Sequence, residues 1–284
     1  MANNNPRAMG INSPEQLDLI NLDRAMDIYK ERFGNAGNFD FFFTGNIDPE
    51  QFEALAAQYI GSLPGSASRE TPQALAIFPP QQVNERFFIG QDQKSTVFLR
   101  YGTQAPYTKE EGRAVGYLSD ALSIILIEEI REKLSGVYSI SASGEASRAP
   151  DSQYGLSIYF PCSPDQTETL IAAVRAELQK IVENGIPEET LAKVKEKRKR
   201  SYRESLNRNT YWNAQLTSIF HEETFTAEEL FGFEEIIDNF PAEAVQRMAA
   251  KLFKEEQALV VQQLPADFNQ ENATNEAVLE ESMP

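Results

Sequence analysis

The single histidine and the single cysteine limit the metal and acid–base chemistry that this chain could perform alone. The 284 residues include one residue of each type, His221 and Cys162. A catalytic zinc ion needs three protein ligands, most often histidine, cysteine or carboxylate side chains. The sequence therefore predicts no metal site, no catalytic residue and no internal disulfide in this chain.

The residues around His221 do not form a helical zinc motif. The motif His-Glu-x-x-His would require histidine at position 225, which is Phe225. The inverted motif His-x-x-Glu-His would require glutamate and histidine where Thr224 and Phe225 stand. We therefore interpret His221 as a structural or solvated residue near a helix end. Cys162, at the end of a predicted strand, is interpreted as a small buried thiol.

A helix-to-strand connection contains an arginine and a tyrosine that could bind a peptide. Arg131 lies in the last turn of a predicted helix, Tyr138 begins the next predicted strand, and Gly136 supplies the bend between them. A guanidinium and a phenol at one sheet end can donate hydrogen bonds to peptide carbonyl groups. Spacing alone favours a plainer interpretation, in which Arg131 interacts with the helix dipole and Tyr138 packs under the sheet.

Two further segments are candidate binding sites: a turn between a predicted strand and a predicted helix, and a run of basic residues. The segment TGNID, residues 44–48, lacks the glycine spacing and the lysine of a phosphate-binding loop. A basic run is typical of a solvated helix whose cations pair with nearby acids, and an acidic partner surface is the alternative. It consists of Lys193, Lys195, Lys197, Arg198, Lys199, Arg200 and Arg203.

Hydrophobic periodicity and capping residues predict the elements that would position these side chains. The helix over 108–134 is apolar on all sides in its middle, so it should lie deep in the core. The other helices are expected over 14–33, 49–60, 163–183, 187–222 with a break near 207–209, from 226, and over 241–253. Strands are expected over 39–45, 83–90, 95–101, 137–147, 153–162 and 257–264.

This order of elements predicts an α/β fold of the two-layer α+β type, with a mixed, roughly six-stranded sheet and helices packed mainly on one face. Strands without an intervening helix, over 83–101 and 137–162, should form antiparallel hairpins. We expect a flexible lead-in over 1–13, one folded domain over 14–264 and an acidic, disordered tail over 265–284.

Composition and hydropathy exclude two classes of partner. The chain has 26 Lys and Arg against 43 Asp and Glu, a net charge of −17, and nucleic-acid binding needs clustered cations. No apolar run approaches the roughly 20 residues that span a bilayer. The amino terminus also lacks the basic start and apolar stretch of a secretory signal. We therefore expect neither nucleic acid nor a membrane as partner.

In their order and spacing, these segments resemble the C-terminal-type domain of the insulinase/pitrilysin family of inverted-motif zinc peptidases, the inverzincins. The resemblance covers about residues 15–264. It rests on the turn GNID at 45–48 with GSLP downstream, on residues 131–138, and on GIPEETLAKVK at 185–195. Family members have two halves, each built of two related α/β domains, and the first domain holds the inverted zinc motif. The resemblance therefore implies a metallopeptidase, insulinase-like domain fold.

The resemblance also implies a role for two residues. The last domain of family members commonly supplies an arginine and a tyrosine that hold the substrate backbone near the scissile bond. The matching positions here are Arg131 and Tyr138, which shifts the interpretation toward substrate binding. Because the inverted zinc motif is absent, the zinc is expected in a separate catalytic half, and this chain is expected to be inactive alone.

Two functions follow from the resemblance and stay open. In the first, the chain is a non-catalytic, substrate-gripping domain that acts with a zinc-bearing N-terminal half of the same or a partner protein. The segment REKLSGVYS, residues 131–139, resembles the second half of fused bacterial enzymes, which suggests a C-terminal fragment of a bacterial zinc protease. The resemblance makes the periplasm plausible for the full-length bacterial protein, whereas this chain does not show its own compartment. In the second, the chain is a structural or assembly subunit of the same family with no proteolytic role. A stand-alone enzyme using Asp and Glu alone is least favoured.

Overall fold

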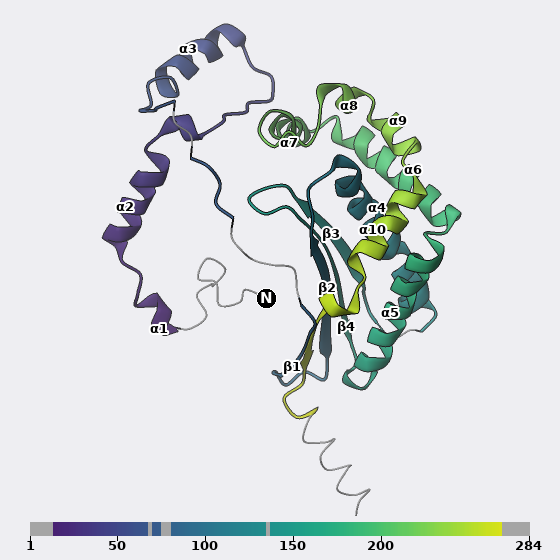
Figure 1. Ribbon diagram of the computed structural model, residues 1–284. Coiled ribbons are helices and arrows are strands. Elements are labelled where there is room, and N and C mark those ends of the chain that lie inside the picture. The colour runs from purple at the N-terminus through teal and green to yellow at the C-terminus, as the bar shows by residue number, and fades with distance from the viewer. Residues whose placement is uncertain (1–13, 68–69, 75–80, 135–136, 269–284) are drawn as a thin grey trace, which may run out of the picture. The chain divides into compact units, whose positions relative to one another are not determined.

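The computed structural model describes residues 14–67, 70–74, 81–134 and 137–268 (Figure 1). The chain divides into two compact units, one containing residues 78–198 and 238–284 and the other residues 2–77 and 199–237. The lead-in predicted over 1–13 and most of the tail predicted over 265–284 lie outside the described residues. The proposed domain over 14–264 stays a prediction.

A five-stranded mixed sheet forms the centre of the first unit, with the strand order β1-β5-β2-β4-β3. Its strands are β1 (Val83–Phe88), β2 (Ser95–Gln104), β3 (Ser141–Ser147), β4 (Gln153–Cys162) and β5 (Leu259–Leu264). β1 is parallel to β5, whereas every other neighbouring pair is antiparallel. The predicted mixed sheet is therefore confirmed, with five strands in the described part of the chain.

One of the two predicted hairpins is present and the other is wrong. β3 and β4 form the expected antiparallel pair. β1 and β2 do not pair, because β5 lies between them and Leu259 is opposite both Val83 and Arg100. β5 is apolar and mostly buried, so it is stable with a neighbouring strand on each side. A local sequence rule could not place this strand, since it comes from the far end of the chain.

Helices cover one face of this sheet (Figure 1). They are α4 (Lys109–Leu126), α5 (Thr167–Asn184), α10 (Ala242–Leu252) and the first part of α6 (Glu188–Ser205). Alternate residues of β2 point into the core between sheet and helices, as Val97, Leu99 and Tyr101 are buried and the residues between them are partly exposed. The predicted packing of helices on one face is confirmed.

The helix that begins after Thr108 is buried along most of its length. The Thr108 side chain accepts a hydrogen bond from the Glu111 backbone N–H at 3.1 Å, which forms the predicted N-cap. No residue from 111 to 130 is exposed, as the all-round apolar sequence predicts. α4 continues into a π-helical turn, Ile127–Glu132. None of the helices in the described ranges is sufficiently long and apolar to span a membrane.

The second unit is largely helical. Its helices are α1 (Pro14–Leu17), α2 (Leu22–Phe33), α3 (Pro49–Tyr59), α7 (Asn209–Phe220), α8 (Ala227–Phe231) and α9 (Phe233–Asp238). The single helix predicted over 14–33 is divided, because the Asn21 side chain caps α2 by accepting from the Arg24 N–H. The predicted break near 207–209 is confirmed between α6 and α7.

The strand predicted over 39–45 is wrong. No strand of the described chain pairs with this segment. Instead, the Asn213 side-chain amide donates to the Phe42 carbonyl at 2.9 Å, and the Thr44 hydroxyl donates to the Asn209 carbonyl at 3.1 Å. The apolar sequence is typical of a strand covered on both faces, but the described chain offers it no sheet edge.

Candidate functional site

Arg131 lies in the π-helical turn that ends the buried helix α4. Such turns are rare and occur frequently at functional sites. In the described part of the chain, the Arg131 guanidinium pairs with the neighbouring Glu132 carboxylate at 3.3 Å, and the Arg131 side chain is 43% exposed. An exposed pair of this kind holds a side chain weakly. Arg131 therefore keeps donors that a ligand could use.

Tyr138 lies where the edge strand of the sheet begins. Ser141 is opposite Tyr159 in the β3–β4 ladder, and Val137 forms an isolated antiparallel bridge with Cys162. The stretch from 137 to 141 is one residue longer than the stretch from 159 to 162, so it contains a β-bulge. Bulges redirect side chains and are over-represented next to active sites.

The bulge leaves the Tyr138 side chain in solvent, since the residue is 92% exposed. The alternative interpretation, in which Tyr138 packs under the sheet, is therefore wrong. Arg131 and Tyr138 thus lie on one short connection between α4 and edge strand β3, on either side of residues 135–136, which include Gly136 and lie outside the described residues. Both side chains are hydrogen-bond donors suited to carbonyl oxygens.

Cys162 is buried at the end of β4, beneath this connection. Burial raises the pKa of its thiol to about 11, and the nearby Asp165 carboxylate adds to this effect. A thiol that stays protonated at neutral pH is a poor nucleophile. The prediction of a small buried thiol is confirmed.

His221 lies in the second unit, with Nδ1 at 2.7 Å from Asp40 Oδ2. This contact fits the structural role predicted for His221. In the ranges that the structure describes, no three His, Cys, Asp or Glu side chains come together to hold a metal ion.

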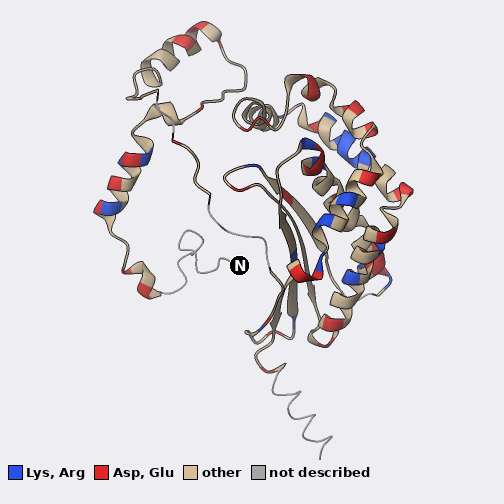
Figure 2. Cartoon of the chain, in the orientation of Figure 1, with Lys and Arg blue, Asp and Glu red and all other residues tan. Residues whose placement is uncertain are grey.

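The basic run on α6 is paired within the chain. Lys197 and Arg198 both contact the Asp120 carboxylate, at 2.8 and 2.6 Å, and Lys193 contacts Glu189 at 3.0 Å. Figure 2 shows the basic residues of α6 interspersed with acidic ones. The interpretation as a solvated helix whose cations pair with nearby acids is confirmed for these residues, and the acidic-partner alternative stays a prediction.

A polar group on the helix-free face of the sheet was missed by sequence reasoning. Arg100 on β2 pairs with Glu145 on β3, and its Nη1 lies 3.4 Å from the Ser157 hydroxyl on β4. The signal was present in the alternation of β2, since Leu99 is buried and Arg100 must therefore point to the opposite face. The partners could not be predicted without the register of the three strands.

Comparison with known proteins identifies the family. The sequence pattern described as "Peptidase M16 inactive domain" matches residues 20–198. A protein of Arabidopsis thaliana named "Zinc protease PQQL-like" is 22% identical over 204 residues, which cover 66% of this chain and 21% of that protein. The chain therefore spans about a fifth of the length of this relative.

Solved structures have the same fold. The periplasmic protease PqqL from Escherichia coli superposes with a TM-score of 0.61 at 20% identity, covering 78% of this chain and 24% of that one. A peptidase M16 inactive domain from Pseudomonas fluorescens gives a TM-score of 0.65 at 18% identity, covering 87% and 58%. The predicted insulinase-like fold is thus confirmed. The chain belongs to the peptidase M16 family of zinc proteases and contains that family's inactive domain.

Proposed function

We propose that this chain is the non-catalytic, substrate-gripping domain of a zinc metalloendopeptidase of the insulinase/pitrilysin family. It acts with a separate zinc-bearing half to cleave peptides. The observation that carries the proposal is the 92% exposure of Tyr138 in a bulge of the edge strand, on the same connection as Arg131.

Arg131 and Tyr138 would hold the peptide backbone rather than change it chemically. The guanidinium N–H groups and the phenol O–H donate to carbonyl oxygens of the bound peptide. These hydrogen bonds strengthen when the two halves close and exclude water, because the local dielectric falls. The proposal assigns the bond-breaking chemistry to the other half, because this sequence has a single histidine and lacks the inverted zinc motif.

The test is peptide turnover by the assembled enzyme carrying Arg131→Ala or Tyr138→Phe. Loss of a hydrogen bond from a charged donor typically costs about 1.5–3 kcal/mol. We therefore expect Arg131→Ala to lower turnover roughly ten- to a hundredfold. Tyr138→Phe removes a neutral donor, so we expect a loss of roughly two- to tenfold.

Two neighbouring residues provide matched controls. Lys133→Ala removes an exposed cation that is paired with Glu129 at 2.7 Å, and Tyr159→Phe removes another exposed phenol of the same sheet. Both controls should turn over peptide as the wild type does, and all four variants should keep the zinc content of the catalytic half. Wild-type turnover with Arg131→Ala and Tyr138→Phe would instead favour a structural or assembly subunit.

A further inference from the structure

Glu132 accompanies Arg131 in the π-helical turn and forms an ion pair with it. The Glu132 Oε1 atom lies 3.3 Å from the Arg131 Nη2 atom, and the two side chains are 59% and 43% exposed. Residues adjacent in a helical sequence do not face each other, so this contact requires the two side chains to bend toward one another across the surface. The donors of Arg131 are therefore presented with a carboxylate beside them.

The other two carboxylates of this turn contact different cations. Glu129 contacts Lys133 at 2.7 Å, and Glu128 contacts Lys193 on α6 at 3.5 Å. In the part of the chain that the structure describes, Glu132 is thus the acid of this turn that lies against the arginine.

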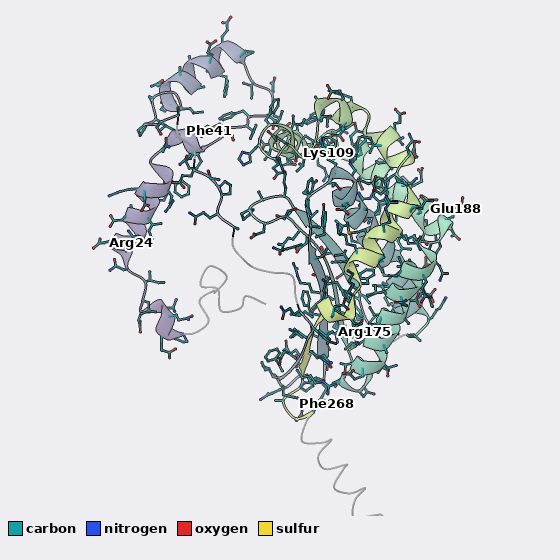
Figure 3. All side chains as sticks on the ribbon, in the orientation of Figure 1. Arg24, Phe41, Lys109, Arg175, Glu188 and Phe268 are labelled. Carbon is teal, nitrogen blue, oxygen red and sulfur yellow. The ribbon has the colours of Figure 1, made fainter. Side chains whose placement is uncertain are left out.

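The position of Glu132 is unfavourable for the helix. α4 begins at Lys109, labelled in Figure 3, ends at Leu126 and continues into the π-helical turn, Ile127–Glu132. The carbonyl end of a helix carries a partial negative charge, so a carboxylate there is destabilising, whereas a cation there is favourable. Residues that break such a local rule are expected at functional sites. Helix stability therefore does not account for Glu132, whereas a role toward Arg131 does.

A guanidinium without a neighbouring carboxylate prefers acidic ligands. Arginine binds carboxylates through two parallel, charge-assisted hydrogen bonds, which are stronger than hydrogen bonds to neutral carbonyl groups. The Glu132 carboxylate balances the charge of Arg131, occupies part of its donor set and repels a second carboxylate. Because a guanidinium has five N–H donors, the remaining ones stay available to neutral carbonyl oxygens. The pair is thus suited to a peptide backbone and unsuited to an acidic group.

We propose that Glu132 is a specificity-determining residue of the peptide site. It makes Arg131 select neutral backbone carbonyl groups and reject acidic side chains and free carboxylates near the bond that is cleaved. This inference rests on the proposed function, which places the substrate backbone against Arg131. The net charge of −17 acts in the same direction, because an acidic protein repels acidic peptides at long range. Glu132 acts through Arg131 and takes no part in bond breaking.

The experiment compares two peptides that differ by one charge. The zinc-bearing half from the same organism, assembled with this chain, is given a peptide with glutamine beside the cleaved bond, located by mass spectrometry, and an otherwise identical peptide with glutamate there. We expect the wild type to cleave the glutamine peptide with a kcat/KM at least roughly fivefold higher. With Glu132→Gln, the uncovered guanidinium attracts the glutamate side chain, so this preference should disappear or reverse. A wild type without the preference, or an unchanged preference in Glu132→Gln, would overturn the proposal.

Two matched variants separate Glu132 from the general charge of the turn. Glu132→Asp keeps the carboxylate and should keep most of the preference for the glutamine peptide. Glu129→Gln removes a carboxylate that is paired with Lys133, and the preference should change less than about twofold, because exposed charges are screened by salt. Equal changes with Glu129→Gln and Glu132→Gln would contradict the proposal. A merely structural effect of Glu132→Gln would lower cleavage of both peptides alike and leave their ratio unchanged, which also counts against it.

The variant Arg131→Ala shows which of the two proposals fails. If Arg131→Ala lowers turnover of the glutamine peptide and Glu132→Gln leaves the ratio of the two peptides unchanged, the proposed function stands and the specificity role fails. If Arg131→Ala has wild-type turnover, the proposed function fails and the specificity role fails with it. The coupling is measured by adding Glu132→Gln to Arg131→Ala, where the ratio should change less than it does when Arg131 is present.

Discussion

Arg131 and Tyr138 are available to a ligand because the backbone is irregular at both positions. The π-helical turn carries Arg131 beyond the end of α4, and the bulge places Tyr138 outside the β3–β4 ladder. A regular helix end and a regular strand would have directed these side chains differently. The residue types were readable in the sequence, whereas the bulge depends on how β3 is registered against β4.

Cys162 gives a prediction that depends mainly on the burial of its thiol. Its thiol has a pKa of about 11, whereas an exposed thiol has a pKa near 8.5. At pH 8 the folded chain should therefore react with a disulfide reagent at least about a hundredfold more slowly than the chain in denaturant. A folded chain that reacts at the rate of a free thiol would contradict this burial.

The raised pKa of Cys162 also predicts how the free energy of unfolding changes with pH. The folded-state pKa of Cys162 lies above its unfolded value, so the folded chain holds this proton more tightly. Its contribution to stability is complete below about pH 8.5 and falls as the pH rises toward about 11. In the Cys162→Ala variant, this loss of unfolding free energy between about pH 8.5 and about pH 11 should disappear. Urea denaturation at a series of pH values measures the difference between the variant and the wild type.

At the scale of elements, the N-cap of α4 offers a direct test of the helix that supports Arg131. The Thr108 hydroxyl satisfies the Glu111 N–H, which has no partner within the helix. Thr108→Ala should lower the free energy of unfolding by about 1 kcal/mol, while Thr108→Ser should retain most of the stability. Urea denaturation of the two variants measures the difference. Equal losses would show that the hydroxyl contributes nothing.

Local signals predicted most of the helices, because caps and periodicity act within a few residues. The side chains of Thr108, Asp48 and Thr226 accept backbone hydrogen bonds at the N-caps of α4, α3 and α8, at or directly before the predicted helix starts. The sheet was predicted less completely, since strand order depends on partners far away in sequence. β5 separates β1 from β2, and residues 39–45 are not part of the sheet in the described chain. Both errors concern pairing rather than the residue pattern of a strand.

At the scale of the whole molecule, the chain has the fold of the family's inactive domain and a sequence with a single histidine and a single cysteine. One histidine and one cysteine lie in different compact units, and neither joins a metal-ligating group among the described residues. What the chain offers instead is a pair of exposed hydrogen-bond donors, Arg131 and Tyr138. The proposed function assigns these donors to a bound peptide and the cleavage to a separate zinc-bearing half.

The most direct test of this account is peptide turnover by the zinc-bearing half titrated with this chain, with the chain alone assayed in parallel. We expect no cleavage by the chain alone, slow cleavage by the zinc-bearing half alone, and turnover that rises with added chain to saturation. Chain carrying both Arg131→Ala and Tyr138→Phe should associate but raise turnover little. Cleavage by the chain alone, or full activity of the zinc-bearing half without it, would contradict the account.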